Sequence, residues 1–103
     1  MAAQVLALYN KPADPTHFEQ YYYGTHVAIA KQLPGLRKYT TNKGAIGAPD
    51  GAAAYYLIAI LEFDSMDAIQ SAFASPQGQA AVEDVSKFAT GGISLLMYET
   101  QTV

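Results

Sequence analysis

The chain has 103 residues, half of them hydrophobic and only 15% charged, with a formal net charge of −3 and no cysteine. This length suits one domain over residues 1–103, and the lack of cysteine excludes disulfides and thiolate chemistry. The six basic residues are scattered, which argues against a nucleic-acid partner. Residues 1–103 hold no leader-like segment and no membrane-length apolar run, so we expect a cytoplasmic protein without a membrane role. Because few residues are charged, we expect exposed apolar surface and self-association.

A short buried strand and an aromatic-rich helix open the chain. Residues 4–9 form a nearly continuous apolar run, which predicts a strand buried on both faces. Asp14 suits the N-cap of the following helix and Pro15 its first position, while the proline-glycine pair at 34–35 ends it. Its apolar stripe, at helical spacing, consists of Phe18, Tyr22, Ile29 and Leu33, flanked by Tyr21, Thr25 and His26. An unpartnered polar group buried there costs about 1–3 kcal/mol, so we expect Tyr22 and His26 to bond each other or a ligand.

The rest of the chain alternates strands, a glycine-rich connection and helices. Further strands are expected at residues 36–43, 55–63 and 93–98. Residues 44–54 contain three glycines and a proline, which indicates a long flexible connection that is free to act as a lid. Ser65 can cap a second helix, and Ser75-Pro76 restarts a helix that runs through Phe88.

This order, β-α-β-β-α-β, predicts an α+β fold of the ferredoxin-like type, with both helices on one face of a four-stranded antiparallel sheet. Alternation within residues 55–63 places Tyr55 and Leu57 on one face of their strand. The same alternation places Tyr56, Ile58 and Ile60 on the other face. The face without helices is therefore apolar and would meet water in a monomer. Its simplest closure is a homodimer in which two such sheets pack face to face.

His26 is the candidate for acid–base chemistry, because an imidazole with an ordinary pKa of about 6.5 takes and returns a proton near neutrality. The alternative is a core histidine held by Tyr22 or by a backbone carbonyl. The tyrosines offer flat apolar walls with hydroxyl tips suited to an aromatic or lactone ligand, or else they pack the core and the dimer interface. Tyr22 and Tyr39 are the preferred ligand-binding residues, because one shares the stripe of His26 and the other lies on the next strand.

We expect no metal ion and no bound cofactor. His17 and His26 do not share one helical face, and no carboxylate follows His26 by one turn, so metal-ligand spacing is absent. The remaining acidic residues are interpreted as helix-start charges and a solvated face: Asp64, Asp67, Glu83 and Asp84. The glycines of residues 44–51 lie between two strands, which argues against a nucleotide. A haem needs a large cavity besides an axial ligand such as His26, and no pattern marks such a cavity.

Four motifs are spread over nearly the whole chain: Phe18-x-x-Tyr21-Tyr22-x-x-x-His26, Leu33-Pro34-Gly35-Leu36-Arg37-x-Tyr39, Ile60-x-x-Phe63-Asp64-Ser65 and Phe73-x-Ser75-Pro76-x-Gly78-Gln79-Ala80. Together they resemble the EthD family, named for a protein of ethyl tert-butyl ether degradation, in the dimeric α+β barrel superfamily. The resemblance implies a homodimer whose sheets form a barrel, with a pocket between the helices and the sheet of each subunit. In one departure, Val27-Ala28-Ile29 follows His26 where the family often has His-x-Pro-Leu, so we expect a straighter helix.

Relatives in that superfamily include cofactor-free monooxygenases, muconolactone isomerases, haem-degrading enzymes and decarboxylases or dehydratases of polyketides. The residues expected to bind a ligand beside His26 are Tyr22, Tyr39, Tyr21, Phe18 and Tyr55. One hypothesis is an enzyme without a bound cofactor, of the oxygenase, decarboxylase or dehydratase type, in which His26 shuttles a proton on a small hydrophobic carbonyl or phenolic molecule. The others are a non-catalytic carrier or accessory protein of a degradation pathway, and a structural dimer without a ligand. One histidine and several phenols suit the first two equally.

Overall fold

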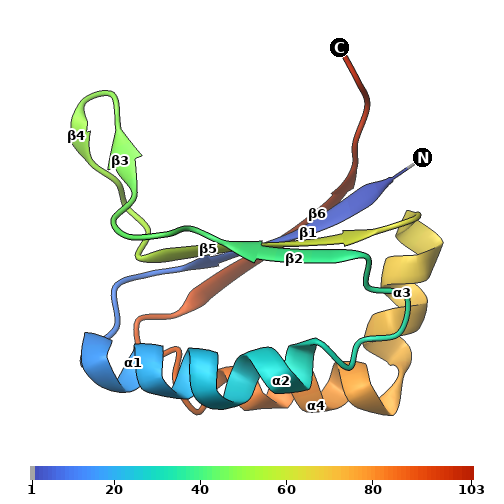
Figure 1. The fold of residues 1–103 in the computed structure, drawn as a ribbon, viewed down its shortest axis with the longest axis horizontal. Helices are drawn as coiled ribbons and strands as arrows, with labels where there is room; N and C mark the ends of the chain where they lie inside the picture. The colour runs from blue at the N-terminus through green and yellow to red at the C-terminus, as the bar shows by residue number, and fades with distance from the viewer. Residues whose placement is uncertain (1) are drawn as a thin grey trace.

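Four strands form one antiparallel sheet, and the helices all lie on one side of it (Figure 1). The computed structural model describes residues 2–103. The elements in chain order are β1 (Ala3–Tyr9), α1 (Pro15–Tyr21), the π-helical η1 (Tyr22–His26), α2 (Val27–Ala30), β2 (Lys38–Thr41), β3 (Gly47–Ala48), β4 (Gly51–Ala52), β5 (Leu57–Phe63), α3 (Met66–Ala74), α4 (Pro76–Val85) and β6 (Ile93–Glu99). Among the helices of residues 2–103, none is both long enough and apolar enough to cross a membrane.

The strands are arranged in the order β2-β5-β1-β6, and every neighbouring pair is antiparallel. β1 lies inside the sheet, with Ala7 opposite Ala59 on one side and opposite Leu95 on the other. This is the ferredoxin-like α+β arrangement, and it confirms the β-α-β-β-α-β order expected from the sequence. The expected strand at residues 36–43 is shortened to β2, and β5 begins at Leu57 rather than at residue 55.

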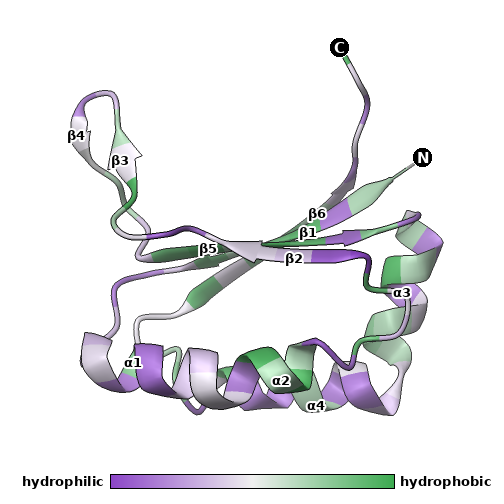
Figure 2. Cartoon of the chain, viewed as in Figure 1, coloured by the Kyte–Doolittle hydropathy of each residue, from purple (hydrophilic) through white to green (hydrophobic). Residues whose placement is uncertain are grey.

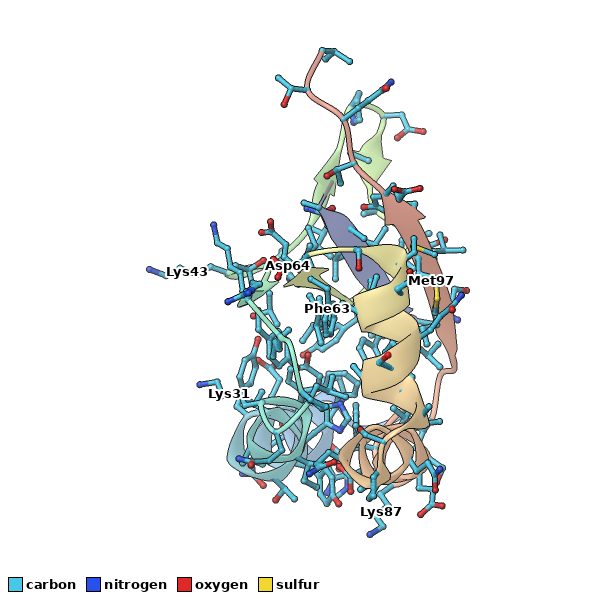
Figure 3. All side chains as sticks on the ribbon, turned by 90° about the vertical axis from the view of Figure 1, so that its right-hand side faces the viewer. Lys31, Lys43, Phe63, Asp64, Lys87 and Met97 are labelled. Atoms are coloured by element: carbon cyan, nitrogen blue, oxygen red, sulfur yellow. The ribbon has the colours of Figure 1, made fainter. Side chains whose placement is uncertain are left out.

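The core fills the layer between the sheet and the helices. Alternate residues of β1 and β5 point into this layer and are buried: Ala3, Val5, Ala7 and Tyr9 with Leu57, Ala59, Leu61 and Phe63. Figure 2 shows hydrophobic residues along these strands and on α2, and in Figure 3 Phe63 lies in the layer. Phe18 and Phe88 meet edge to face with 5.2 Å between their ring centroids. This aromatic contact holds α1 against the segment that follows α4.

The first helix starts as expected and then changes its winding. Asp14 Oδ1 accepts from the His17 N–H at 3.2 Å, and Pro15 occupies the first position. After Tyr21 the chain passes into the π-helical turn η1, in which the Val27 N–H donates to the Tyr22 carbonyl. The sequence pattern did not indicate this change in winding, and the expectation of a straighter helix in the absence of a proline stays a prediction. Single π-helical turns inside α-helices occur frequently at functional sites.

Two serines begin the helices on the other side of the layer. Ser65 Oγ accepts from the Ala68 N–H and Ser75 Oγ accepts from the Gly78 N–H, both at 3.0 Å, which confirms the two expected helix starts. A side chain at Gly78 would lie 2.2 Å from the Ala72 carbonyl oxygen, so the close corner between α3 and α4 requires glycine. From this corner α4 runs beside η1 and α2 beneath the sheet (Figure 1).

The segment before β5 differs from the expectation. The glycine-rich connection pairs as the short β3–β4 hairpin, with Gly47 opposite Ala52, and it projects beyond the sheet (Figure 1). The alternation grouped Tyr56 with Ile58 and Ile60 on one face of the strand, and this grouping is wrong for Tyr56. Its hydroxyl donates to Glu19 Oε2 on the side of the helices at 2.6 Å. The reason is that regular strand alternation begins only at Leu57, one residue later.

The opposite face of the sheet carries no helix (Figure 1). Leu6 lies in register with Ile60 on β5 and with Leu96 on β6, which places the three side chains on this face. Leu6 and Ile60 are half-buried, and Leu96 is 51% exposed. The expected apolar face without helices is therefore confirmed for these strands.

Candidate functional site

A cavity of about 370 Å³ lies between the helices and the sheet. This volume is in the range of sites for small molecules. Its walls are mostly aliphatic and come from the strands, from α2, α3 and α4, and from the segments beside them: Val5, Ala7, Ala30, Leu33, Ala59, Leu61, Phe73, Ala81, Val85, Ala89 and Ile93. The polar side chains that line it include Tyr9, Tyr22, His26 and Tyr39. Such walls favour a ligand that is largely hydrophobic.

The cavity opens between α4 and β6. Val82 and Ser86 at the end of α4, together with Leu95 on β6, line the cavity and are also exposed. Val82 is 52% exposed and Leu95 is 44% exposed. The rim is therefore largely apolar, which allows a hydrophobic molecule to enter without passing a ring of charged side chains.

His26 is held inside the cavity by a carboxylate from the neighbouring helix. Its Nδ1 lies 3.0 Å from Asp84 Oδ2, and the side chains of the two residues are 6% and 3% exposed. The wide turn of η1 buries Tyr22 together with His26, with 5.4 Å between their ring centroids. Phe88 packs against the imidazole at 4.7 Å. The π-helical turn, α4 and Phe88 together fix the orientation of the imidazole ring.

Burial and hydrogen bonding act in opposite directions on this pair. Burial lowers the pKa of His26 below its ordinary value of 6.5, and this outweighs the opposing effect of Asp84. Burial alone would raise the pKa of Asp84. Hydrogen bonds from Tyr21, at 2.6 Å, and from His26 nevertheless hold this pKa below its ordinary value of 3.8. At neutral pH the pair is therefore a carboxylate beside a neutral imidazole, and Nδ1 carries the proton that Asp84 accepts.

The second ring nitrogen, Nε2, is free for a ligand. No group among residues 2–103 forms a hydrogen bond with Nε2. Every fully buried side-chain nitrogen or oxygen in that range has a hydrogen-bond partner, so Nε2 is not fully enclosed. His26 itself lines the cavity. A neutral imidazole with a free Nε2 accepts a proton, which is the chemistry of a general base. Within residues 2–103, no three His, Cys, Asp or Glu side chains converge to hold a metal ion.

Three tyrosines bring hydroxyl groups to the same cavity. The hydroxyls of Tyr22 and Tyr39 are 2.6 Å apart, and both residues line the cavity. Burial raises the pKa of both phenols, so they remain protonated at neutral pH. Tyr9, which is only 2% exposed, also lines the cavity, and burial raises the pKa of its phenol. The cavity thus combines one base with several hydroxyl donors.

The structure brings together some of the residues expected to bind a ligand and separates others. Tyr22, Tyr39 and His26 line one cavity. Tyr21 acts through Asp84, to which it donates. Phe18 is a core residue stacked behind Tyr22, with 5.7 Å between the ring centroids. Tyr55 lines a separate hollow next to the β3–β4 hairpin, because it precedes β5 and leaves the regular strand.

Two residues of this site were missed in the sequence. Asp84 was assigned to a solvated face, and this is wrong, because it is 3% exposed. The sequence pattern that could have identified Asp84 is its position between Ala81 and Phe88 at helical spacing. These two residues are buried, and they belong to the side of α4 and of the following turn that packs against the core. Tyr9 was treated only as part of a buried strand. The end of a strand gives no sequence signal for the direction in which a hydroxyl points.

The comparison with family models matches residues 10–92 to the EthD domain. The chain belongs to the EthD family. An uncharacterised 11.0 kDa protein encoded in the thcB–thcC intergenic region of Rhodococcus erythropolis is 38% identical over 102 residues, which cover 97% of this chain and 96% of that protein. The crystal structure of an EthD family protein from Bacillus halodurans has a TM-score of 0.89 and 30% identity, over 98% of this chain and 100% of that one.

More distant structures share the ferredoxin-like fold with this EthD family chain. A dimeric ferredoxin-like protein from Thermobifida fusca has a TM-score of 0.71 at 15% identity, over 97% of this chain and 92% of that one. SnoaB, a cofactor-independent oxygenase from Streptomyces nogalater, has a TM-score of 0.63 at 17% identity, over 99% of this chain and 94% of that one. At these identities the likeness shows the fold alone.

Proposed function

We propose that this EthD family protein binds a small hydrophobic carbonyl or phenolic molecule in the cavity, and that His26 moves a proton on that molecule without a bound cofactor. The observation that carries the proposal is the buried pair of His26 and Asp84, in which Nδ1 is held by the carboxylate, Nε2 has no partner among residues 2–103, and His26 lines an apolar cavity. A base in such a site acts at neutral pH because its lowered pKa keeps it unprotonated. Aromatic, lactone and polyketide-like molecules have the required hydrophobic bodies.

In the proposed reaction, Asp84 acts as a positioning residue and His26 as the base. Nε2 takes a proton from a carbon next to the carbonyl group, or from a phenolic hydroxyl, and later returns it. The developing negative charge on the ligand oxygen meets the tyrosine hydroxyls, which are donors at neutral pH. A dehydratase reaction without a cofactor can proceed through such a transfer, and an oxygenase reaction can do so with dioxygen as the co-reactant that is reduced. A decarboxylase reaction fits this cavity less well, because its substrate carries a carboxylate. The shared fold with a cofactor-independent oxygenase supports this class of reaction by analogy only.

A non-catalytic carrier or accessory protein of a degradation pathway is the second candidate. It is supported by the walls of the cavity, which are mostly aliphatic and, among the described residues, hold His26 as their one basic side chain. In that case His26 and the tyrosines orient the molecule and return it unchanged. Binding would then be found without any proton exchange.

Proton exchange on an aryl ketone separates these two functions. Incubation of acetophenone with the protein in deuterated water should replace its methyl protons faster than buffer alone, as followed by the loss of the methyl NMR signal. His26→Gln should remove this acceleration, because the amide cannot act as a base. His17→Gln is the matched control, since this second histidine lies exposed on α1. Binding with no exchange above buffer in the natural protein would favour the carrier.

We also propose that two copies pair through the helix-free face of the sheet. Leu96 is 51% exposed on this face, next to half-buried Leu6 and Ile60, and a dimeric protein shares the fold. Leu96→Glu should convert a dimer into a monomer in sedimentation experiments. Val82→Glu is the control, because Val82 is 52% exposed but lies on α4 on the other side of the sheet. A natural protein that sediments as a monomer would contradict the pairing.

A further inference from the structure

We infer that the cavity selects an uncharged carbonyl compound over a carboxylate of the same shape, with the carbonyl oxygen held by the hydroxyls of Tyr9 and of the Tyr22–Tyr39 pair. This inference rests on the proposed function and names the class of ligand that the same site takes. It is carried by the unused hydroxyl donors of the residues that line the cavity and by the lack of lysine and arginine among the described lining residues.

The Tyr22–Tyr39 pair has one donor to spare. Each phenol carries one O–H, and the contact of 2.6 Å between the two oxygens uses one of these two protons. Whichever tyrosine donates to its neighbour, the O–H of the other is left without a partner in the pair. Both residues line the cavity, but Tyr22 is fully buried, so the spare donor is available to a ligand oxygen when Tyr22 donates to Tyr39.

Tyr9 supplies a second free donor. Its ring is fixed by edge-on contacts with Phe18 and Tyr22, at centroid distances of 5.5 Å and 5.7 Å. No hydrogen bond joins its hydroxyl to another group among residues 2–103. Every fully buried side-chain oxygen in that range has a hydrogen-bond partner, so the Tyr9 hydroxyl is not fully enclosed. This nearly buried side chain lines the cavity. Two free donors and the Nε2 lone pair suit a ligand with a carbonyl oxygen and a neighbouring acidic proton.

The charges around the cavity oppose an anion. The described residues that line it include no lysine and no arginine. The nearest charge behind the imidazole is the Asp84 carboxylate, which would repel a second carboxylate. Lys87 Nζ is 3.8 Å from Asp84 Oδ1, but the lysine is exposed and points away from the layer between helices and sheet (Figure 3). The hydroxyls can donate to either ligand, but a carboxylate would lose far more hydration than a neutral carbonyl and would meet no lysine or arginine among the described lining residues.

Three probes of nearly the same shape test this selectivity: acetophenone, benzoate and ethylbenzene. Dissociation constants are measured by NMR titration of the natural protein at about pH 7.5, where benzoate is ionised. We expect acetophenone to bind at least about tenfold more tightly than benzoate and more tightly than ethylbenzene, which lacks the oxygen. Equal or tighter binding of benzoate would overturn the inference, and so would failure of acetophenone to bind.

Tyr9→Phe tests the role of the hydroxyl without changing the ring. It should weaken acetophenone about fivefold and leave ethylbenzene unchanged, which also shows that the variant keeps its cavity. Tyr98→Phe is the matched control, because the Tyr98 hydroxyl donates to Gln4 outside the cavity. An equal loss for both probes would give Tyr9 a packing role only and would overturn its assignment. Selective binding of acetophenone without proton exchange would reject the proposed reaction but retain this inference. Proton exchange on acetophenone together with equal binding of benzoate would retain the proposed reaction but reject this inference.

Discussion

Asp84 and Asp64 each lie within hydrogen-bond distance of a basic side chain, but their surroundings differ. His26 Nδ1 is 3.0 Å from Asp84, and Arg37 Nη2 is 2.7 Å from Asp64. The side chains of the first pair are 6% and 3% exposed, and those of the second are 67% and 66% exposed. Water solvates the exposed ions, so that pair adds little to stability. Burial lowers the pKa of the histidine of the first pair, so this carboxylate lies beside a neutral imidazole at neutral pH.

The largest effect is expected from removing the buried carboxylate. Asp84→Ala should lower the free energy of unfolding by about 3 kcal/mol, because the Tyr21 hydroxyl and the His26 N–H both lose a charged acceptor. Asp64→Ala, the matched control, should have a much smaller effect. Urea unfolding of the two variants and the natural protein measures the difference. Equal losses for both variants would mean that burial does not distinguish the two pairs.

An intermediate effect is expected from pH. The pKa of His26 is lowered in the folded protein, so the folded state binds fewer protons than the unfolded state between that pKa and the ordinary value of 6.5. The free energy of unfolding should therefore fall as the pH drops below about 6.5 and level off below the folded pKa. Asp64 does not contribute in this window, because its pKa is held below 3.8 by Arg37.

Urea unfolding at about pH 7.5 and about pH 5 checks this effect. The natural protein should lose more stability between the two values than His26→Gln does. His17→Gln should keep the dependence of the natural protein, since His17 is exposed on α1. A stability that rises on acidification would show a His26 pKa raised by folding, and with it a charged imidazole beside Asp84.

The smallest effect is expected from Tyr21→Phe. Tyr21 donates to Asp84 Oδ1, and its loss leaves more negative charge for the imidazole, so the pKa of His26 should rise. NMR titration of the imidazole signal measures this change. Tyr23→Phe is the control, because its hydroxyl bonds Thr41 at 3.1 Å and is remote from the carboxylate. A His26 pKa that stays constant in Tyr21→Phe would show that this tyrosine does not tune the pair.

Local patterns determined much of this fold. Hydrophobic runs marked three strands of the sheet, and a polar run rich in Thr and Tyr marked the fourth. The caps at Asp14, Ser65 and Ser75 marked helix starts that the structure confirms. Such signals depend on neighbours within a few residues, so they can be recognised without the fold. The same patterns could not show that β5 starts only at Leu57, nor that Tyr56 turns toward Glu19, because those features depend on how the strand joins the sheet.

For the site, the sequence by itself determined that His26 shares a helical stripe with Tyr22, and this followed from their spacing alone. The tertiary structure decided which groups meet them. Asp84 is 58 residues from His26 and Tyr39 is 17 residues from Tyr22. Pairing across such separations depends on the rotation of α4 and on the register of β2, which are set by packing of the whole core. Only that packing could turn an acidic residue of an amphipathic helix into the partner of a buried base.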